Sequence, residues 1–234
     1  MKKLIILFFI LIIAVPHMTN AATNNDRAAQ SFKAGGVSIL IPVPSSVFVE
    51  AGDSRSLMEL FVPQNNRLLS GFVFPEDLPL LAKGGDDSIL TKYALVEVPR
   101  RGEYMDCGTN DFKDVISGAK KSFGDITTSS LKEAEEEFNR RMESLDVTNA
   151  QLSIGNPLQL GCLFSKSDAY GFGMIAEVSM SGKNIKMAMG SALLRVKKRL
   201  VFVYLYAEYK NDDTVKWIRK TTEEWSDAIL KANG

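Results

Sequence analysis

Two cysteines are the residues whose type and spacing point most directly to chemistry. Cys107 and Cys162 are the only cysteines in the chain of 234 residues. They form no Cys-x-x-Cys motif, so in an oxidising compartment a structural disulfide is favoured over a redox-active pair. Such a bridge would close a loop of about 55 residues and stabilise the fold by about 4 kcal/mol in the chain-entropy model. The alternative is an apolar core position for Cys162 and a free thiol at Cys107.

Histidine is nearly missing, which excludes several kinds of catalytic and metal site. The one histidine, His17, falls in an N-terminal segment that we expect to be removed. Without it the chain cannot form a Ser-His-Asp or Cys-His arrangement, and two cysteines are too few for an all-thiolate zinc site. No Walker, metalloprotease or EF-hand pattern occurs. We therefore expect no catalytic residue, no metal and no cofactor.

Acidic residues cluster at three places but do not follow a metal-binding pattern. The clusters are Asp86-Asp87, residues 133–137 and Asp212-Asp213. None lies in a loop that supplies enough converging oxygens for calcium. A solvated helix face and a helix start account for the second and third clusters.

Four aromatic side chains are candidates for a binding surface. Tyr170, Tyr204 and Tyr206 lie in expected strands, where they could line a groove, although cross-strand packing is the commoner use. Trp217 lies off the apolar stripe of the last expected helix, so it is a candidate contact residue. A set of basic residues could contact anionic lipid head groups or protect a sheet edge: Arg100, Arg101, Lys197, Lys198 and Arg199.

The N-terminus has the three parts of a secretory signal peptide. Two lysines precede an apolar run over residues 4–15, Pro16 ends that run, and small side chains follow at Thr19 and Ala21. The run is shorter than the roughly 20 apolar residues that a membrane-spanning helix needs. We therefore expect residues 1–21 to be cleaved and the mature protein, which then has no transmembrane segment, to be periplasmic.

The remaining chain reads as one domain. We expect a flexible lead-in over residues 22–35 and a single α+β domain over residues 36–234. Basic and acidic residues are equal in number, at 28 each, so charge gives no case for nucleic-acid binding.

Apolar periodicity predicts strands first, then two helices, then strands and a final helix. A strand is expected over residues 37–44, followed by a hairpin of residues 57–62 and 68–74 and a strand over 89–98. Helical spacing predicts helices over residues 111–123, 130–145 and 212–232, the last with Trp225 as a buried anchor and Asn211 or Asp212 as N-cap. Strands are expected over residues 158–164, 170–180, 185–196 and 200–209, the last three as an antiparallel meander. This order predicts an α+β fold with a central antiparallel sheet packed by helices.

The pattern resembles the PsbP-like and DcrB-like proteins. The resemblance rests on the meander, the apolar strand over residues 200–209, the final helix with Trp225 and Ile229-Leu230, and the early strand that starts at Val37 with Phe48 nearby. It extends over about residues 36–231 and contains no diagnostic motif. It implies an α/β/α sandwich, and for the DcrB-like members an exported bacterial protein.

Three functions are compatible with these observations. The first is a non-enzymatic envelope protein that binds another protein or an envelope component. The second is a small-ligand or lipid carrier with an apolar pocket between sheet and helices, lined by Met174, Met187, Met189 and tyrosines. The third is a carboxylate-dependent hydrolase, which needs two acidic groups facing one cleft.

Export is directly testable. We expect the protein from a periplasmic extract to begin at Ala22 and to lack His17, as measured by N-terminal sequencing and intact mass. The replacement Ala21→Tyr removes the small residue before the cut and should block cleavage. A full-length chain in the cytoplasmic fraction would contradict the prediction.

Overall fold

The computed structural model describes residues 29–79, 90–124, 128–144, 151–180 and 182–234. The predicted signal peptide, residues 1–21, lies outside this described part.

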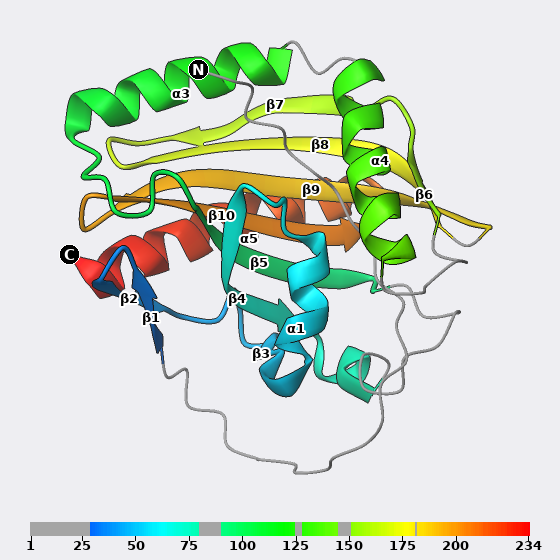
Figure 1. The fold of residues 1–234 in the computed structure, drawn as a ribbon, viewed down its shortest axis with the longest axis horizontal. Coiled ribbons are helices and arrows are strands. Elements are labelled where there is room, and N and C mark those ends of the chain that lie inside the picture. Colours follow the sequence, from blue (N-terminus) through cyan, green and yellow to red (C-terminus); the bar gives the residue numbers. More distant parts are fainter. Residues whose placement is uncertain (1–28, 80–89, 125–127, 145–150, 181) are drawn as a thin grey trace.

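An antiparallel sheet is the centre of the fold (Figure 1). Its eight strands follow the order β3-β4-β5-β10-β9-β8-β6, and β7 also pairs with β8. The strands are β3 (Val49–Glu50), β4 (Asn66–Val73), β5 (Lys92–Pro99), β6 (Leu152–Ile154), β7 (Leu158–Ser165), β8 (Ala169–Met180), β9 (Lys183–Val196) and β10 (Arg199–Glu208). The expected meander of β8, β9 and β10 is confirmed, and β10 lies inside the sheet between β5 and β9. A separate hairpin joins β1 (Gln30–Ala34) to β2 (Val37–Ile41).

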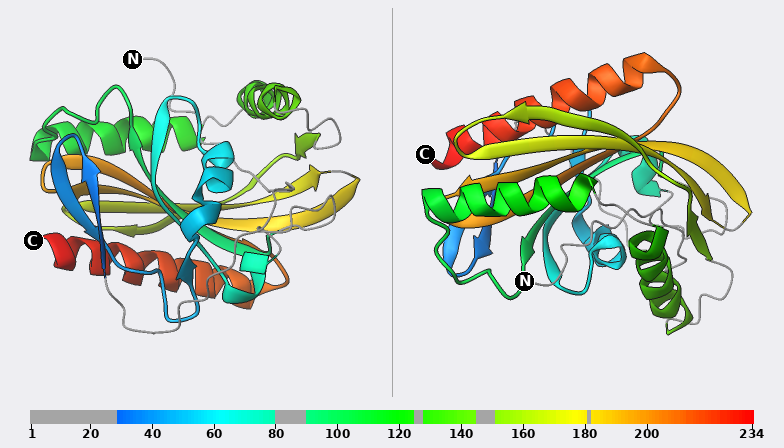
Figure 2. Two further views of the ribbon diagram at one scale, coloured as in Figure 1. Left: turned by 60° about the horizontal axis from the view of Figure 1, so that its bottom comes forward. Right: turned by 90° about the horizontal axis from the view of Figure 1, so that it is seen from above.

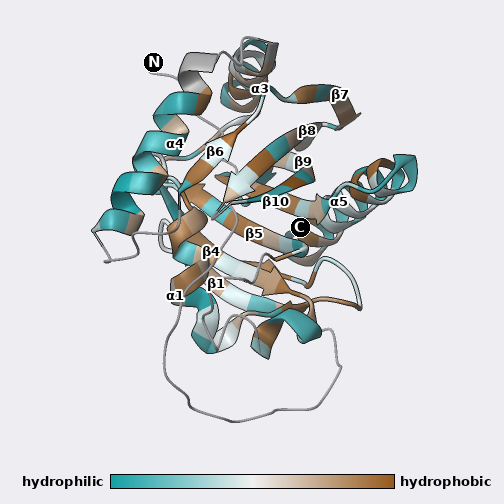
Figure 3. Ribbon diagram, turned by 90° about the vertical axis from the view of Figure 1, so that its right-hand side faces the viewer, coloured by the Kyte–Doolittle hydropathy of each residue, from teal (hydrophilic) through white to brown (hydrophobic). Residues whose placement is uncertain are grey.

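Helices cover both faces of the sheet (Figure 2). On one face lies α5 (Asp212–Asn233), together with the β1–β2 hairpin. On the other lie α3 (Thr109–Gly124), α4 (Thr128–Glu143) and the short helical turns α1 (Arg55–Met58) and η2 (Glu59–Phe61). Figure 3 shows α4 as largely hydrophilic, while the strands beneath it carry much of the hydrophobic colour. The predicted α+β fold is confirmed.

Small and large side chains alternate along β9, so the two faces of the sheet carry side chains of different size. Ala188, Gly190 and Ala192 face α5, while Met187 and Met189 belong to the layer under α3 and α4. Successive side chains of a strand point to opposite faces, so one strand can present small residues on one side and large ones on the other. The small side lets α5 run close to the backbone of β9 and β10, whereas α3 makes no comparable backbone approach to any described strand.

Polar contacts fix α5 at its start and along its C-terminal half. The Asn211 side chain accepts a hydrogen bond from Asp213 N at 2.9 Å, which caps the helix as predicted. The Trp225 ring is fully buried, and its Nε1 donates to Pro42 O at 2.8 Å. The Asn233 amide bonds both backbone groups of Leu40, at 2.7 and 2.9 Å. The expected anchor role of Trp225 is confirmed.

Two sequence predictions are wrong in detail. Residues 57–62 form α1 and η2 instead of a strand, because their buried side chains, Leu57, Met58, Phe61 and Val62, recur at helical spacing. The predicted flexible lead-in over residues 22–35 ends in strand β1, which pairs with β2 through the turn at Gly35-Gly36. Both glycines have positive φ, which suits a tight hairpin.

The close contact between β9 and α5 predicts the effect of one substitution. A Cβ added to Gly190 would lie 2.2 Å from Thr222 Oγ1 and 2.8 Å from Ile218 Cγ2. Gly190→Ala should therefore destabilise the protein by about 1–3 kcal/mol through overpacking, as measured by urea unfolding. Gly118→Ala on the exposed face of α3 is the matched control, since a Cβ there meets nothing within 4 Å. That control should stabilise by roughly 1 kcal/mol because alanine favours helix over glycine. Equal stabilities of the two variants would contradict the packing described above.

Candidate functional site

The three predicted tyrosines lie on one face of the sheet, in the layer under α3 and α4. Tyr170 on β8 and Tyr204 and Tyr206 on β10 are 6%, 7% and 2% exposed, so they pack inside the protein and do not form an open groove. Tyr206 stacks on Tyr93 of β5 with ring centroids 4.4 Å apart. The predicted methionines Met174, Met187 and Met189 are buried in the same layer.

Trp217 lies on the opposite face. Its half-buried ring stacks with Phe48 at a centroid distance of 6.3 Å, and Lys92 Nζ lies 5.4 Å from its centre. The structure therefore does not bring Trp217 together with the three tyrosines.

Polar side chains that sequence reasoning missed lie among these aromatic and apolar residues. Glu97 on β5 is 1% exposed, and its Oε2 accepts a hydrogen bond from Asn66 Nδ2 at 2.8 Å. Ser191 on β9 is 1% exposed and lies directly across from Tyr204, and its Oγ has no hydrogen-bond partner among the described residues. A charged residue within the apolar run of β5 is the signal that could have identified Glu97, because such residues are rarely buried without a reason.

Burial keeps the Glu97 carboxyl protonated. Loss of solvation raises its pKa from 4.5 to about 8, against a smaller opposing effect of the Asn66 hydrogen bond. The pKa values of Tyr204 and Tyr206 are also raised, first by burial and then by nearby groups that include Glu97. At neutral pH the layer therefore holds a neutral carboxylic acid, which can donate as well as accept a hydrogen bond.

The helices contact this face on either side of β9 and β10. On α3, Phe123 contacts Phe172 of β8 and Lys120 Nζ lies 5.0 Å from the ring centre of Tyr170. On the other side, Phe61 of η2 lies 5.7 Å from Tyr93 of β5, centroid to centroid. In Figure 1, α3, α4 and α1 surround the middle of the face turned to the viewer, and α5 lies behind the sheet. Glu97 on β5, Tyr204 on β10 and Ser191 on β9 lie on three neighbouring strands between these contacts.

The predicted disulfide does not form in the structure. Cys107 is buried and held beside the β9–β10 turn, where its backbone N donates to Lys198 O at 2.8 Å. Cys162 is exposed on β7, which pairs with the outer side of β8. The alternative prediction placed Cys162 in the core and left Cys107 as a free thiol. Its burial assignment is wrong, because Cys107 is the buried thiol and Cys162 is exposed. Burial and the nearby Asp111 raise the pKa of the Cys107 thiol, which makes it less reactive.

The acidic residues of the clusters that the structure describes make hydrogen bonds that stabilise the fold. On α4, Glu137 accepts from Gln64 N at 3.1 Å and Glu135 accepts from Ile154 N. Asp86-Asp87 fall outside the described residues. Across the described ranges, no three or more histidine, cysteine or acidic side chains gather as metal ligands. No helix in the described part of the chain is long and apolar enough to cross a bilayer.

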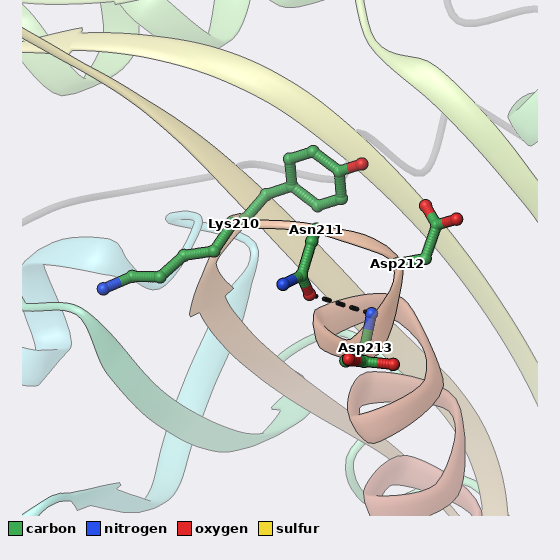
Figure 4. A pocket seen from close by; sticks show the side chains of 5 residues that line it. Lys210, Asn211, Asp212 and Asp213 are labelled. Carbon is green, nitrogen blue, oxygen red and sulfur yellow. Dashed lines mark hydrogen bonds between the residues drawn. The ribbon is translucent and has the colours of Figure 1, made fainter.

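A surface depression lies where β10 passes into α5 (Figure 4). Its lining is Tyr209, Lys210, Asn211, Asp212 and Asp213. The hydrogen bond drawn there is the N-cap of α5, from Asp213 N to the Asn211 side chain. These residues therefore form a helix start, the role predicted for Asp212-Asp213.

Comparison with known proteins gives no family assignment. No family model and no curated protein matches the chain. Among solved structures it is similar to the Ran-binding protein Mog1p of Saccharomyces cerevisiae, with 11% identity over 89% of this chain and 93% of that one and a TM-score of 0.29. It is also similar to the cyanobacterial PsbP (CyanoP) of Synechocystis sp. PCC 6803, with 10% identity over 88% of this chain and 96% of that one and a TM-score of 0.32. These values assign no function to the chain.

The raised pKa of Glu97 predicts a pH-dependent stability. The unfolded chain loses this proton near pH 4.5 and the folded chain near pH 8, so the stabilisation is complete below pH 4.5 and is lost as the pH rises to about 8. The loss is on the order of 1 kcal/mol per pKa unit. Glu97→Gln keeps an acceptor for Asn66 but cannot ionise, so its stability should fall less between pH 5 and pH 8.5 in denaturant unfolding. Asp77, whose pKa burial raises to about 6, contributes equally to both proteins. The same pH dependence in both would contradict the protonated state of Glu97.

Proposed function

We propose that this protein is an exported, non-enzymatic envelope protein that binds an apolar envelope component between its sheet and α3–α4. The component is a lipid-like molecule with an uncharged, hydrogen-bonding head. Export is inferred from residues 1–21, and membership of the PsbP-like and DcrB-like proteins from the sequence pattern.

The buried Ser191 hydroxyl is the observation that carries this proposal. A buried hydroxyl without a hydrogen bond costs about 1–3 kcal/mol, so an unpartnered one needs an explanation. Ser191 lies beside Tyr204 in an apolar layer that also contains the neutral Glu97. Small-molecule binding sites combine an apolar lining with a few convergent polar groups and often a carboxyl of perturbed pKa, and this buried layer has those residue types.

The rest of the layer suits such a ligand. Met174, Met187 and Met189 have flexible, polarisable side chains that adapt to irregular apolar shapes. A neutral Glu97 favours a ligand with an uncharged polar head. An anionic head would lie in the same apolar layer in which ionisation of Glu97 is already unfavourable.

Binding fits the surroundings of Glu97 better than hydrolysis does. A carboxylate hydrolase needs a second acidic group facing the first. Among the described residues, the groups that interact with the Glu97 carboxyl are the Asn66 amide, which hydrogen-bonds to it, and the hydroxyls of Tyr204 and Tyr206.

The proposal can be tested by native mass spectrometry of the mature protein purified from its own periplasm. We expect a retained small molecule, and Ser191→Ala should lower the retained fraction severalfold. The same variant should fold at least as stably as the wild type, because it removes an unsatisfied buried hydroxyl. A purely structural role for Ser191 predicts no change in retention.

Ser226→Ala is the matched control. Ser226 is a buried serine on α5, on the opposite face, and its Oγ donates to Thr222 O at 2.7 Å. The Ser226→Ala variant should lose some stability and should retain the ligand like the wild type. A wild-type protein that carries no small molecule but elutes with a stoichiometric protein partner would overturn the proposal in favour of a protein-binding role.

A further inference from the structure

Two bulky apolar side chains project from the loop between β5 and α3. Tyr104 is 76% exposed and Met105 is 67% exposed, whereas most apolar side chains in the described part of the chain are at least partly buried. Large exposed apolar side chains next to each other on a loop mark an interaction surface more often than isolated ones do.

The loop is held in place by hydrogen bonds to three other segments. Gly35 N donates to the Glu103 carboxylate at 3.0 Å, and Arg67 Nε donates to its other oxygen at 3.0 Å. Arg199 Nη1 donates to Asp106 Oδ1 at 2.7 Å. At the end of the loop, Cys107 N donates to Lys198 O. A Cβ on Gly35 would lie 2.0 Å from Glu103 O, so the hairpin turn and the loop are in direct contact. The two exposed side chains are therefore presented by a fixed backbone.

The same end of the molecule is basic although the chain as a whole is neutral. The β1–β2 hairpin, the β5–α3 loop and the β9–β10 turn lie together there (Figure 1). The exposed cationic side chains at this end are Lys33, Arg100, Arg101, Lys197 and Lys198. The nearby carboxylates are already engaged: Glu103 pairs with Arg67, Asp106 pairs with Arg199 and, at 3.8 Å, with Lys198, and Asp111 accepts from Gly108 N. The Arg67 hydrogen bond lowers the pKa of Glu103, so that carboxylate stays ionised within the pair.

We infer that this end, defined as Tyr104 and Met105 with the five cations named above, docks onto an anionic lipid surface. Lysine and arginine near a bilayer are attracted by anionic head groups, and tyrosine favours the head-group region because its ring is amphipathic. The turn at Lys197-Lys198 places both residues in the left-handed conformation, with φ of 47° and 61°. It thereby presents two lysines beside the apolar pair. This inference goes beyond the proposed ligand and does not depend on it.

Vesicle co-sedimentation of the mature protein tests the docking surface. We expect binding to vesicles of phosphatidylethanolamine with 30% phosphatidylglycerol, and at least tenfold weaker binding to phosphatidylcholine vesicles. Binding should fall severalfold at high salt because mobile ions screen the attraction. The double variant Tyr104→Ser/Met105→Ser and the charge reversal Arg100→Glu/Arg101→Glu should each weaken binding at least fivefold, with thermal unfolding unchanged.

Leu158→Ser and Lys216→Glu are the controls. Leu158 on β7 is 65% exposed. The strand register aligns it with the end of β10 at Glu208, which is opposite to the end with the proposed docking surface. Lys216 is an exposed cation on α5. Both variants should bind like the wild type. No binding to the anionic vesicles, or binding that both loop variants retain, would overturn the inference, and the native mass spectrometry above would be unaffected.

Discussion

The close approach of α5 to β9 at Gly190 shapes the rest of the fold. The helix can reach the strand because Ala188, Gly190 and Ala192 form a smooth surface of small residues beneath it. Trp225, bonded to Pro42, and Asn233, bonded to Leu40, then fix the helix and tie the β1–β2 hairpin to it. That face is packed like a conventional core, with little room for rearrangement.

The opposite face follows from the same strands. Because side chains alternate, the strands with small residues toward α5 present methionine, phenylalanine and tyrosine toward α3 and α4. The side chains of this layer are large, and α3 makes no approach to a described strand comparable to that of α5 to β9. Glu97, Asn66 and Ser191 are buried polar residues in this layer, and the energetic cost of burying such groups is what makes the layer a candidate binding site.

The proposed ligand site and the proposed lipid-docking end occupy different parts of the molecule and rest on different observations. The first rests on buried polar groups in the middle of the sheet, and the second on exposed apolar and basic groups at one end. A protein that carries an apolar envelope component would have use for both, because its cargo is released at or taken from a membrane. The adaptable methionines of the layer under α3 and α4 would suit the binding of cargo, and the fixed backbone of the β5–α3 loop would suit docking.

Local pattern was enough to predict much of the fold. The meander, the three long helices, the Asn211 cap and the Trp225 anchor follow from periodicity and capping, which act over a few residues. Local pattern was misleading at residues 57–62, where a short apolar run suits either a strand or a helical turn. Local pattern does not decide the Cys107–Cys162 pairing, because a disulfide depends on where two distant segments meet, and both cysteines are free in this structure.

The sequence by itself determined the strands' alternation of small and large residues, and it supplied the candidates Tyr170, Tyr204, Tyr206, Met174, Met187 and Met189. Only the tertiary structure decided that these residues share one layer with Glu97, Asn66 and Ser191, while Trp217 lies on the other face. It also decided that Arg100, Lys197 and the exposed Tyr104 meet at one end. The physical reason is that burial and charge proximity arise from the pairing of β5 with the β9–β10 hairpin, and β5 is distant from that hairpin in sequence and adjacent to it only in the folded sheet.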